Sequence, residues 1–261
     1  MRRESFIVDA NTENKFNYLL RLGDNTLILS QQLSQLCGKG PALEEDMALT
    51  NVALDLLGQT RLWFDYAGEL EGAGRDEDQL AHLRDAHDFK NCLLQEQPNG
   101  NYADTMMRQF YFDTWHYFLL RQLLKSSDAR IAEIAEKSLK EVTYHLRRSG
   151  DLIVRLGDGT PDSHAKTQTA ADQLWMYTGE MFNYDGLDQR MVEQGVAPAS
   201  EALRLEWLEH VSEIFSEATL IMPPPHAWMQ KGGKQGTHTE HLGFILAEMQ
   251  FLQRAYPGAQ W

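Results

Sequence analysis

The chain has 261 residues, and its net charge of −14 argues against binding a nucleic-acid backbone, which needs a basic face. No uninterrupted apolar run approaches the roughly 20 residues that span a bilayer, and the N-terminus lacks the apolar core of a signal peptide. Cys37 and Cys92 are the only cysteines. We expect both thiols to be free and buried, which fits a reducing, cytoplasmic compartment.

The N-terminal half of the sequence is dominated by helical periodicity. Residues 1–16 are polar and aperiodic, so we expect a loose N-terminal arm, followed by a single helical domain over residues 17–261. The first helix is predicted from about Tyr18 to Leu36, and the second from about Leu43 to Leu70. Residues 76–96 are expected to form one or two short helical pieces.

The C-terminal half continues the same pattern. Two further long helices are predicted at about residues 102–125 and 129–156, and Gly157–Pro161 closes the second of them. Shorter helices are expected at about residues 167–183, 187–194, 199–220 and 239–256, with a loop rich in proline and glycine at 221–236. No segment shows the alternation of a strand. The four long helices come as two pairs, which predicts an all-α, ferritin-like four-helix bundle with a crossover and additional C-terminal helices.

Each of the four long helices carries an acid near its middle, on an apolar face. A di-iron carboxylate bundle needs one glutamate from each of two helices and a Glu-x-x-His pair from each of the other two. The candidates for such a layer in this chain, as a degenerate former metal site, are Asp24, Asp55, Asp113, His116, Glu141 and His145.

The histidine positions of that layer are incomplete. Only His116 follows a carboxylate, Asp113, by three residues. Three residues after Asp55 stands Gly58, and three after Glu141 stands Tyr144, so His145 is one position too far along. We therefore expect no metal and no catalytic residue in this chain.

The remaining acids need compensation if they are buried, because an isolated buried carboxylate is very costly. We expect an internal network of salt bridges and hydrogen bonds in place of the metal. The cations within helical reach of the acid layer are Arg61, Arg121, Lys140, Arg147 and Arg148.

Several segments match one known family over nearly the whole chain after the N-terminal arm. They are Leu20–Asn25, Ala53–Gln59, Glu96–Asn101 continuing to Ala103–Thr105, Lys140–Glu141 with Tyr144–Arg147, Gly232–Lys234 with Gly236, His238–Gly243, Leu246–Gln250, and Gly258, Gln260 and Trp261. Through them the sequence resembles the structural subunits of bacterial phenylacetyl-CoA epoxidases, which act on the aromatic ring in phenylacetate catabolism.

The resemblance implies a ferritin-like subunit that has no activity of its own and pairs with a catalytic di-iron subunit. It also implies a reductase that carries FAD and a [2Fe–2S] cluster and takes electrons from NADPH. Small accessory subunits are compatible with the same complex. Such a complex inserts one oxygen atom from O₂ into the ring of phenylacetyl-CoA. The alternatives are an independent ferritin-like di-iron oxidase or ferroxidase, which the missing Glu-x-x-His pairs disfavour, and a helical scaffold unrelated to oxygenases, which the resemblance disfavours.

Two motifs near the C-terminus suggest ligand contacts. Lys231 and Lys234 flank a pair of glycines, and ammonium groups beside exposed amides suit a phosphate of coenzyme A. The segment is not a P-loop, and an ordinary surface or subunit-contact loop is the simpler interpretation. His238–His241 contains two histidines beside Glu240, which suggests a metal, but capping of the last helix by Thr239 and Glu240 explains the pattern as well.

Overall fold

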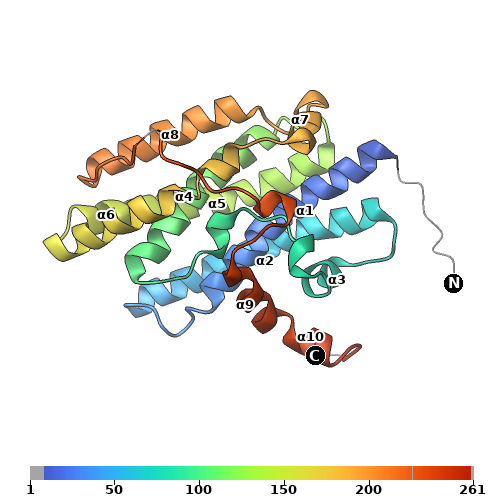
Figure 1. Cartoon of the computed structure of the whole chain (residues 1–261), viewed down its shortest axis with the longest axis horizontal. Helices are drawn as coiled ribbons and strands as arrows, with labels where there is room; N and C mark the ends of the chain where they lie inside the picture. Colours follow the sequence, from blue (N-terminus) through green and yellow to red (C-terminus); the bar gives the residue numbers. More distant parts are fainter. Residues whose placement is uncertain (1–8, 225, 260–261) are drawn as a thin grey trace.

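A computed structural model describes residues 9–224 and 226–259, and within them there are helices and turns but no strand, so the predicted all-α class is confirmed. Two helical hairpins form the four-helix bundle (Figure 1). The first pairs α1 (Ala10–Ser34) with α2 (Leu43–Glu71), and the second pairs α4 (Tyr102–Leu123) with α5 (Ala129–Gly157).

The predicted crossover between the hairpins runs from residue 72 to residue 101. It contains α3 (Glu77–His82) and two short 3-10 turns, Ala86–Asp88 and Leu93–Glu96. Asp76 caps α3 by accepting a hydrogen bond from the Gln79 amide at 2.8 Å. Its second 3-10 turn, Leu93–Glu96, is buried and contacts both α1 and α4, so this end of the crossover is part of the core.

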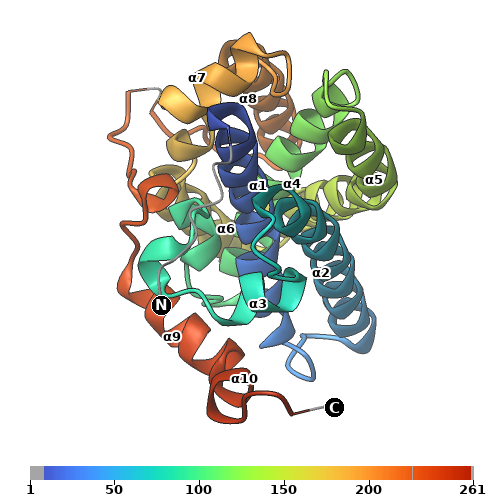
Figure 2. The ribbon, with the colours of Figure 1, turned by 90° about the vertical axis from the view of Figure 1, so that its right-hand side faces the viewer.

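The remaining helices pack around the bundle, except the last one, which projects from it (Figures 1 and 2). They are α6 (Pro161–Trp175), α7 (Gly186–Glu193), α8 (Ser200–Glu217), α9 (Glu240–Met249) and α10 (Phe251–Ala255), with 3-10 turns at Gly179–Phe182 and Gly233–Gln235. The helices α6 and α8 contact both α4 and α5, whereas α7 and α9 contact α1. None of the helices in the described ranges is long and apolar enough to cross a membrane.

The first helix begins earlier than predicted. It starts at Ala10, so the loose arm predicted for residues 1–16 is wrong over its second half. Asp9 caps the helix by accepting from the amides of the next turn, and Lys15 reaches Asp128 at 2.5 Å, so these polar residues have tertiary partners that periodicity does not reveal. The first eight residues of the predicted arm lie outside the described part of the chain.

Two other boundaries differ from the prediction. The helix expected over 167–183 begins at Pro161 and ends at Trp175. The Thr160 side chain accepts from the Ser163 amide at 3.1 Å, and proline is tolerated in a first helical turn, where its missing N–H costs nothing. The helix expected over 239–256 is divided into α9 and α10 at Gln250.

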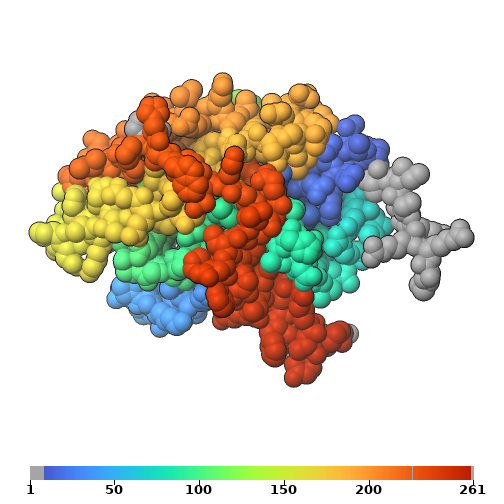
Figure 3. Space-filling model, in the orientation of Figure 1, coloured from blue at the N-terminus to red at the C-terminus, as the bar shows by residue number. Residues whose placement is uncertain are grey.

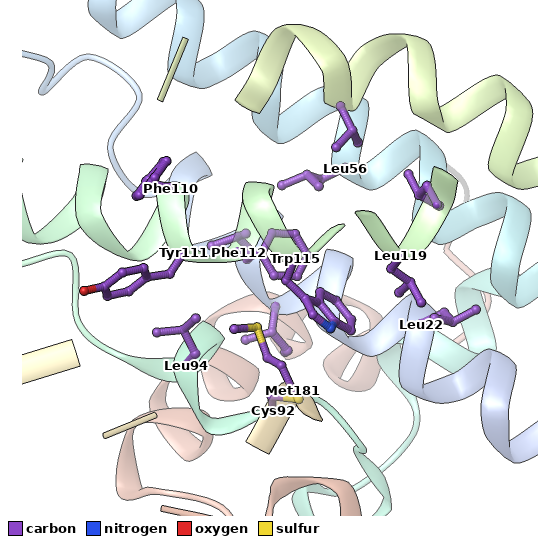
Figure 4. Close-up of a cluster of buried hydrophobic side chains, with 14 of the residues drawn as sticks. Leu22, Leu56, Cys92, Leu94, Phe110, Tyr111, Phe112, Trp115, Leu119 and Met181 are labelled. Atoms are coloured by element: carbon purple, nitrogen blue, oxygen red, sulfur yellow. The ribbon is translucent and has the colours of Figure 1, made fainter. Parts of the chain in front are cut away.

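The core is built around α4, which is buried on nearly every side. Its aromatic residues lie against leucines of α1 and α2 and against side chains of the crossover (Figure 4). Cys92 belongs to this cluster and is fully buried, as predicted, but Cys37 is exposed because it follows the end of α1.

Candidate functional site

Five of the six predicted residues gather between α2, α4 and α5, with His145 at the centre. The Nε2 atom of His145 lies 2.9 Å from Oδ2 of Asp55. Asp113 and His116 of α4 lie close enough that a positive charge on His145 would lower the pKa of each of them. On the solvent side, Gln59 donates to Glu141 at 2.9 Å. We call these residues, with Gln59 and Gln109, the polar cluster.

The deep end of the polar cluster is short of hydrogen-bond partners. Asp113 is fully buried and accepts one hydrogen bond, from Nε2 of Gln109 at 2.6 Å. Burial raises the pKa of Asp113 to about 6 and lowers the pKa of His116 to about 3, so His116 is neutral at pH 7. Atoms of the cluster without a partner in the described part of the protein are Gln59 Oε1, Gln109 Oε1, Asp113 Oδ2, His116 Nδ1 and His145 Nδ1.

These residues do not fit a di-iron centre. The described residues contain no group of three or more His, Cys, Asp or Glu side chains that could hold a metal ion. Tyr144 is exposed, and a Cβ added at Gly58 would meet nothing within 4 Å, so neither missing histidine position faces a ligand set. Two of the four central acids also have other partners, since Asp55 pairs with His145 and Asp24 pairs with Arg84. The cluster can act as polar core, but it lacks the ligand set of an oxygen-activating site.

The sixth residue, Asp24, is bound by an arginine of the crossover. Asp24 is fully buried, and the Arg84 guanidinium contacts both of its carboxylate oxygens, one of them at 3.0 Å. The amide of Lys90 donates to the same carboxylate at 2.8 Å. The guanidinium also lies 4.3 Å from the centroid of the Phe89 ring. Asp24 therefore holds the crossover onto α1.

Arg84 is not one of the five cations that were predicted to compensate the acids, so the prediction named the wrong cations. Among the described residues, none of the five forms an ion pair with Asp24, Asp55, Asp113 or Glu141. The observed pairs of those cations are Arg61–Glu77, Arg121–Glu206 and Arg148–Glu45. Helical spacing places the cations near the acids along the chain, but their side chains extend to other elements.

A second buried carboxylate, Glu96, joins the crossover to the start of α9. It accepts hydrogen bonds from the Thr239 amide at 2.8 Å and from the Thr239 hydroxyl at 2.6 Å. Nδ1 of His238 lies 2.5 Å from it. Burial favours neutral His238, but the hydrogen bond to Glu96, the charge of Glu96 and the contact with the Phe89 carbonyl together outweigh burial and raise the His238 pKa. The His238–His241 motif thus serves this contact, and the Thr239 side chain does not cap α9 as predicted.

Residues 231–236, which precede α9, also pack against the crossover. Glu180 accepts from the amides of Leu93 and Gly232, each at 2.8 Å. A Cβ at Gly233 would lie 2.2 Å from the Asn91 carbonyl oxygen, so this close approach requires glycine. Lys234 is buried, and its ammonium lies 3.1 Å from Asp188, so it is not available to a phosphate, whereas Lys231 is exposed.

The two lysines should therefore respond differently to substitution. Lys234→Met should lower the free energy of unfolding by about 2 kcal/mol, because it removes one of the two cations that pair with Asp188 and leaves Arg21. Lys231→Met should change it by less than about 0.5 kcal/mol. Urea unfolding of both variants measures this, and equal losses would show that the buried ion pair is not what holds the segment.

Comparison with known proteins gives two matches. Residues 2–261 match the model of a family described as phenylacetic acid catabolic protein. The chain is also 51% identical over 244 residues to a curated protein from Escherichia coli strain K12 that is named as a subunit of 1,2-phenylacetyl-CoA epoxidase. That match covers 94% of this chain and 98% of the relative.

Proposed function

Because the chain belongs to the phenylacetic acid catabolic protein family, we propose that it is the structural, non-catalytic subunit of a phenylacetyl-CoA epoxidase. The observation that supports the lack of catalytic activity is the set of contacts made by the four central acids. Asp24 binds Arg84, Asp55 binds His145, Glu141 accepts from Gln59, and Asp113 is left with a raised pKa. The relative's name, which makes it one subunit of an epoxidase, supports the assignment to a complex of several chains.

In this proposal the chemistry belongs to the partners. A catalytic subunit holds the di-iron centre, and a reductase with FAD and a [2Fe–2S] cluster supplies electrons from NADPH. The complex transfers one oxygen atom from O₂ to the aromatic ring of phenylacetyl-CoA, and this chain supports the catalytic subunit. Of the two predicted phosphate contacts, only Lys231 is free to meet coenzyme A or a partner subunit. We place the complex in the cytoplasm, where thiols such as that of Cys37 stay reduced.

Co-expression tests the assignment. The catalytic subunit and reductase of the same organism should form epoxide from phenylacetyl-CoA at full rate only when this chain is present. This chain with the reductase alone should form none. Activity of that pair, or an unchanged rate of the catalytic subunit without this chain, would refute the proposed role. Nothing in the site favours an independent di-iron oxidase or ferroxidase.

Iron loading gives a second prediction. After anaerobic incubation with ferrous iron and desalting, this chain should retain far less than one iron atom, because its donor set is incomplete. The catalytic subunit treated in parallel is the control and should retain about two. Iron measured by plasma emission spectroscopy at a similar level in both proteins would contradict the prediction.

A further inference from the structure

The C-terminal helices form an arm, residues 240–259, that projects from the body of the molecule (Figures 1 and 3). Three large apolar side chains on it are mostly exposed, namely Phe244 at 71%, Phe251 at 62% and Tyr256 at 59%. Leu83, which follows α3 and lies beside the arm, is 53% exposed. Several large exposed apolar side chains on one projecting arm mark it as a candidate interface.

Two cavities lie on either side of α10, and Arg254 lines both. The first has a volume of about 570 Å³, and Gly243, Ala247 and Phe251 are among its lining residues. A Cβ added at Gly243 would meet nothing within 4 Å, so the floor of this cavity is open to another backbone. The second has a volume of about 780 Å³ and lies between Leu83 and Tyr256.

The arm is fixed to the crossover by polar contacts. Nε2 of the Gln250 side chain donates to the carbonyls of Ala81 and Arg84 at 3.1 and 3.0 Å. Arg254 donates to the Arg84 carbonyl at 2.8 Å and pairs with Asp85 at 3.0 Å. Its apolar side chains are therefore held in place before any partner arrives, which lowers the entropy lost on binding.

The rim of this surface is acidic. Asp76, Asp78 and Asp85 line the two cavities, and Arg254, which is already paired with Asp85, is the one Lys or Arg in either lining. The only histidine in the linings, His82, adds no compensating charge at pH 7, because burial lowers its pKa. An apolar centre with an acidic rim complements a helix whose apolar stripe is flanked by lysines or arginines.

We propose that the arm and α3 together form the docking surface for a basic-flanked amphipathic helix of the catalytic epoxidase subunit. This inference rests on the proposed function, because the partner is the one named there. A second copy of this chain is disfavoured, since a symmetric contact through this surface would oppose the acidic rim of one copy to that of the other.

Binding to the purified catalytic subunit of the same organism tests the apolar part. Phe251→Ser combined with Tyr256→Ser should raise the dissociation constant at least tenfold, because exposed aromatic side chains of an interface carry much of its affinity. Leu205→Ser is the matched control: Leu205 is 68% exposed on α8, on the opposite side of the molecule (Figure 1), and its loss should change the constant less than twofold. Unchanged thermal unfolding confirms that the variants are folded.

A charge variant tests the rim independently. Asp78→Lys, which leaves the Asp76 cap of α3 intact, should slow association and flatten its dependence on salt, whereas Glu201→Lys on α8 should not. If the wild-type chain does not bind the catalytic subunit, the proposed function itself fails. If it binds and both arm variants bind as their controls do, only the docking surface is refuted. Self-association of the chain that is lost in the Phe251/Tyr256 variant would also overturn it, in favour of a second copy.

Discussion

Replacing Arg84 by methionine should destabilise the protein by about 3–5 kcal/mol. The substitution leaves the Asp24 carboxylate fully buried with only the Lys90 amide as a partner. Removing one member of a buried ion pair is costly because the remaining charge stays desolvated. Urea unfolding at pH 7, monitored by circular dichroism, measures the loss.

Arg61→Met is the matched control for this prediction. Arg61 pairs with Glu77 at 3.3 Å, but its side chain is 69% exposed, so its loss should cost less than about 1 kcal/mol. Adding Asp24→Asn to Arg84→Met should restore part of the stability, because it removes the stranded charge. Similar losses for Arg84 and Arg61, or no recovery in the double variant, would show that the pair does not hold the crossover.

The Arg84 variant should also loosen the C-terminal arm of residues 240–259. Arg84 binds Asp24 through its side chain, and its backbone carbonyl accepts hydrogen bonds from Gln250 and Arg254. The buried polar core and the proposed docking surface thus meet at one residue. If the proposed docking surface is right, displacing α9 and α10 through Arg84 should therefore weaken the binding of the partner as well.

The helices were predictable because their signals are local. The second helix begins at Leu43 as predicted and ends at Glu71, where Gly72 adopts a left-handed conformation with φ of +65°. The end of α5 at Gly157 was predicted to within one residue, because the glycines and the proline of residues 157–161 are a local stop signal. Periodicity failed where tertiary contacts decide, as in the polar first turns of α1, which pack against Asp128 and α7.

The candidate site was predictable only in part. Spacing along single helices identified the acids and also the absence of histidine at positions 58 and 144. It could not identify Arg84, which is 60 residues from Asp24 and lies in the crossover. The motif Glu96–Asn101 contributes to the family resemblance, but its role as the anchor of Thr239 requires the folded chain, because the contact spans 143 residues. Sequence patterns report one element at a time, whereas buried charges are compensated between elements.

Asp113→Asn should stabilise the protein at pH 7–8, by up to about 3 kcal/mol. Burial raises the pKa of Asp113 to about 6 in the folded protein, against a usual value of 3.8. A carboxyl with a raised folded pKa binds its proton more tightly in the folded state, so stability falls as pH rises from about 4 to about 6 and is then level. Asparagine avoids this loss because it carries no charge, and its Oδ1 can keep the hydrogen bond from Nε2 of Gln109.

Asp24→Asn is the control, because the substitution and the degree of burial are the same while the surroundings differ. Asp24 is bound by Arg84, so its neutralisation leaves a buried guanidinium without its counter-charge and should destabilise the protein by about 3 kcal/mol or more. Unfolding free energies measured from pH 4 to pH 8 should therefore move in opposite directions for the two variants, and the Asp113 variant should lose its own contribution to the pH dependence. A destabilising Asp113→Asn at pH 8 would mean that this carboxylate has a cationic partner in solution, and the polar cluster would then be a charged site instead of a neutral remnant of one.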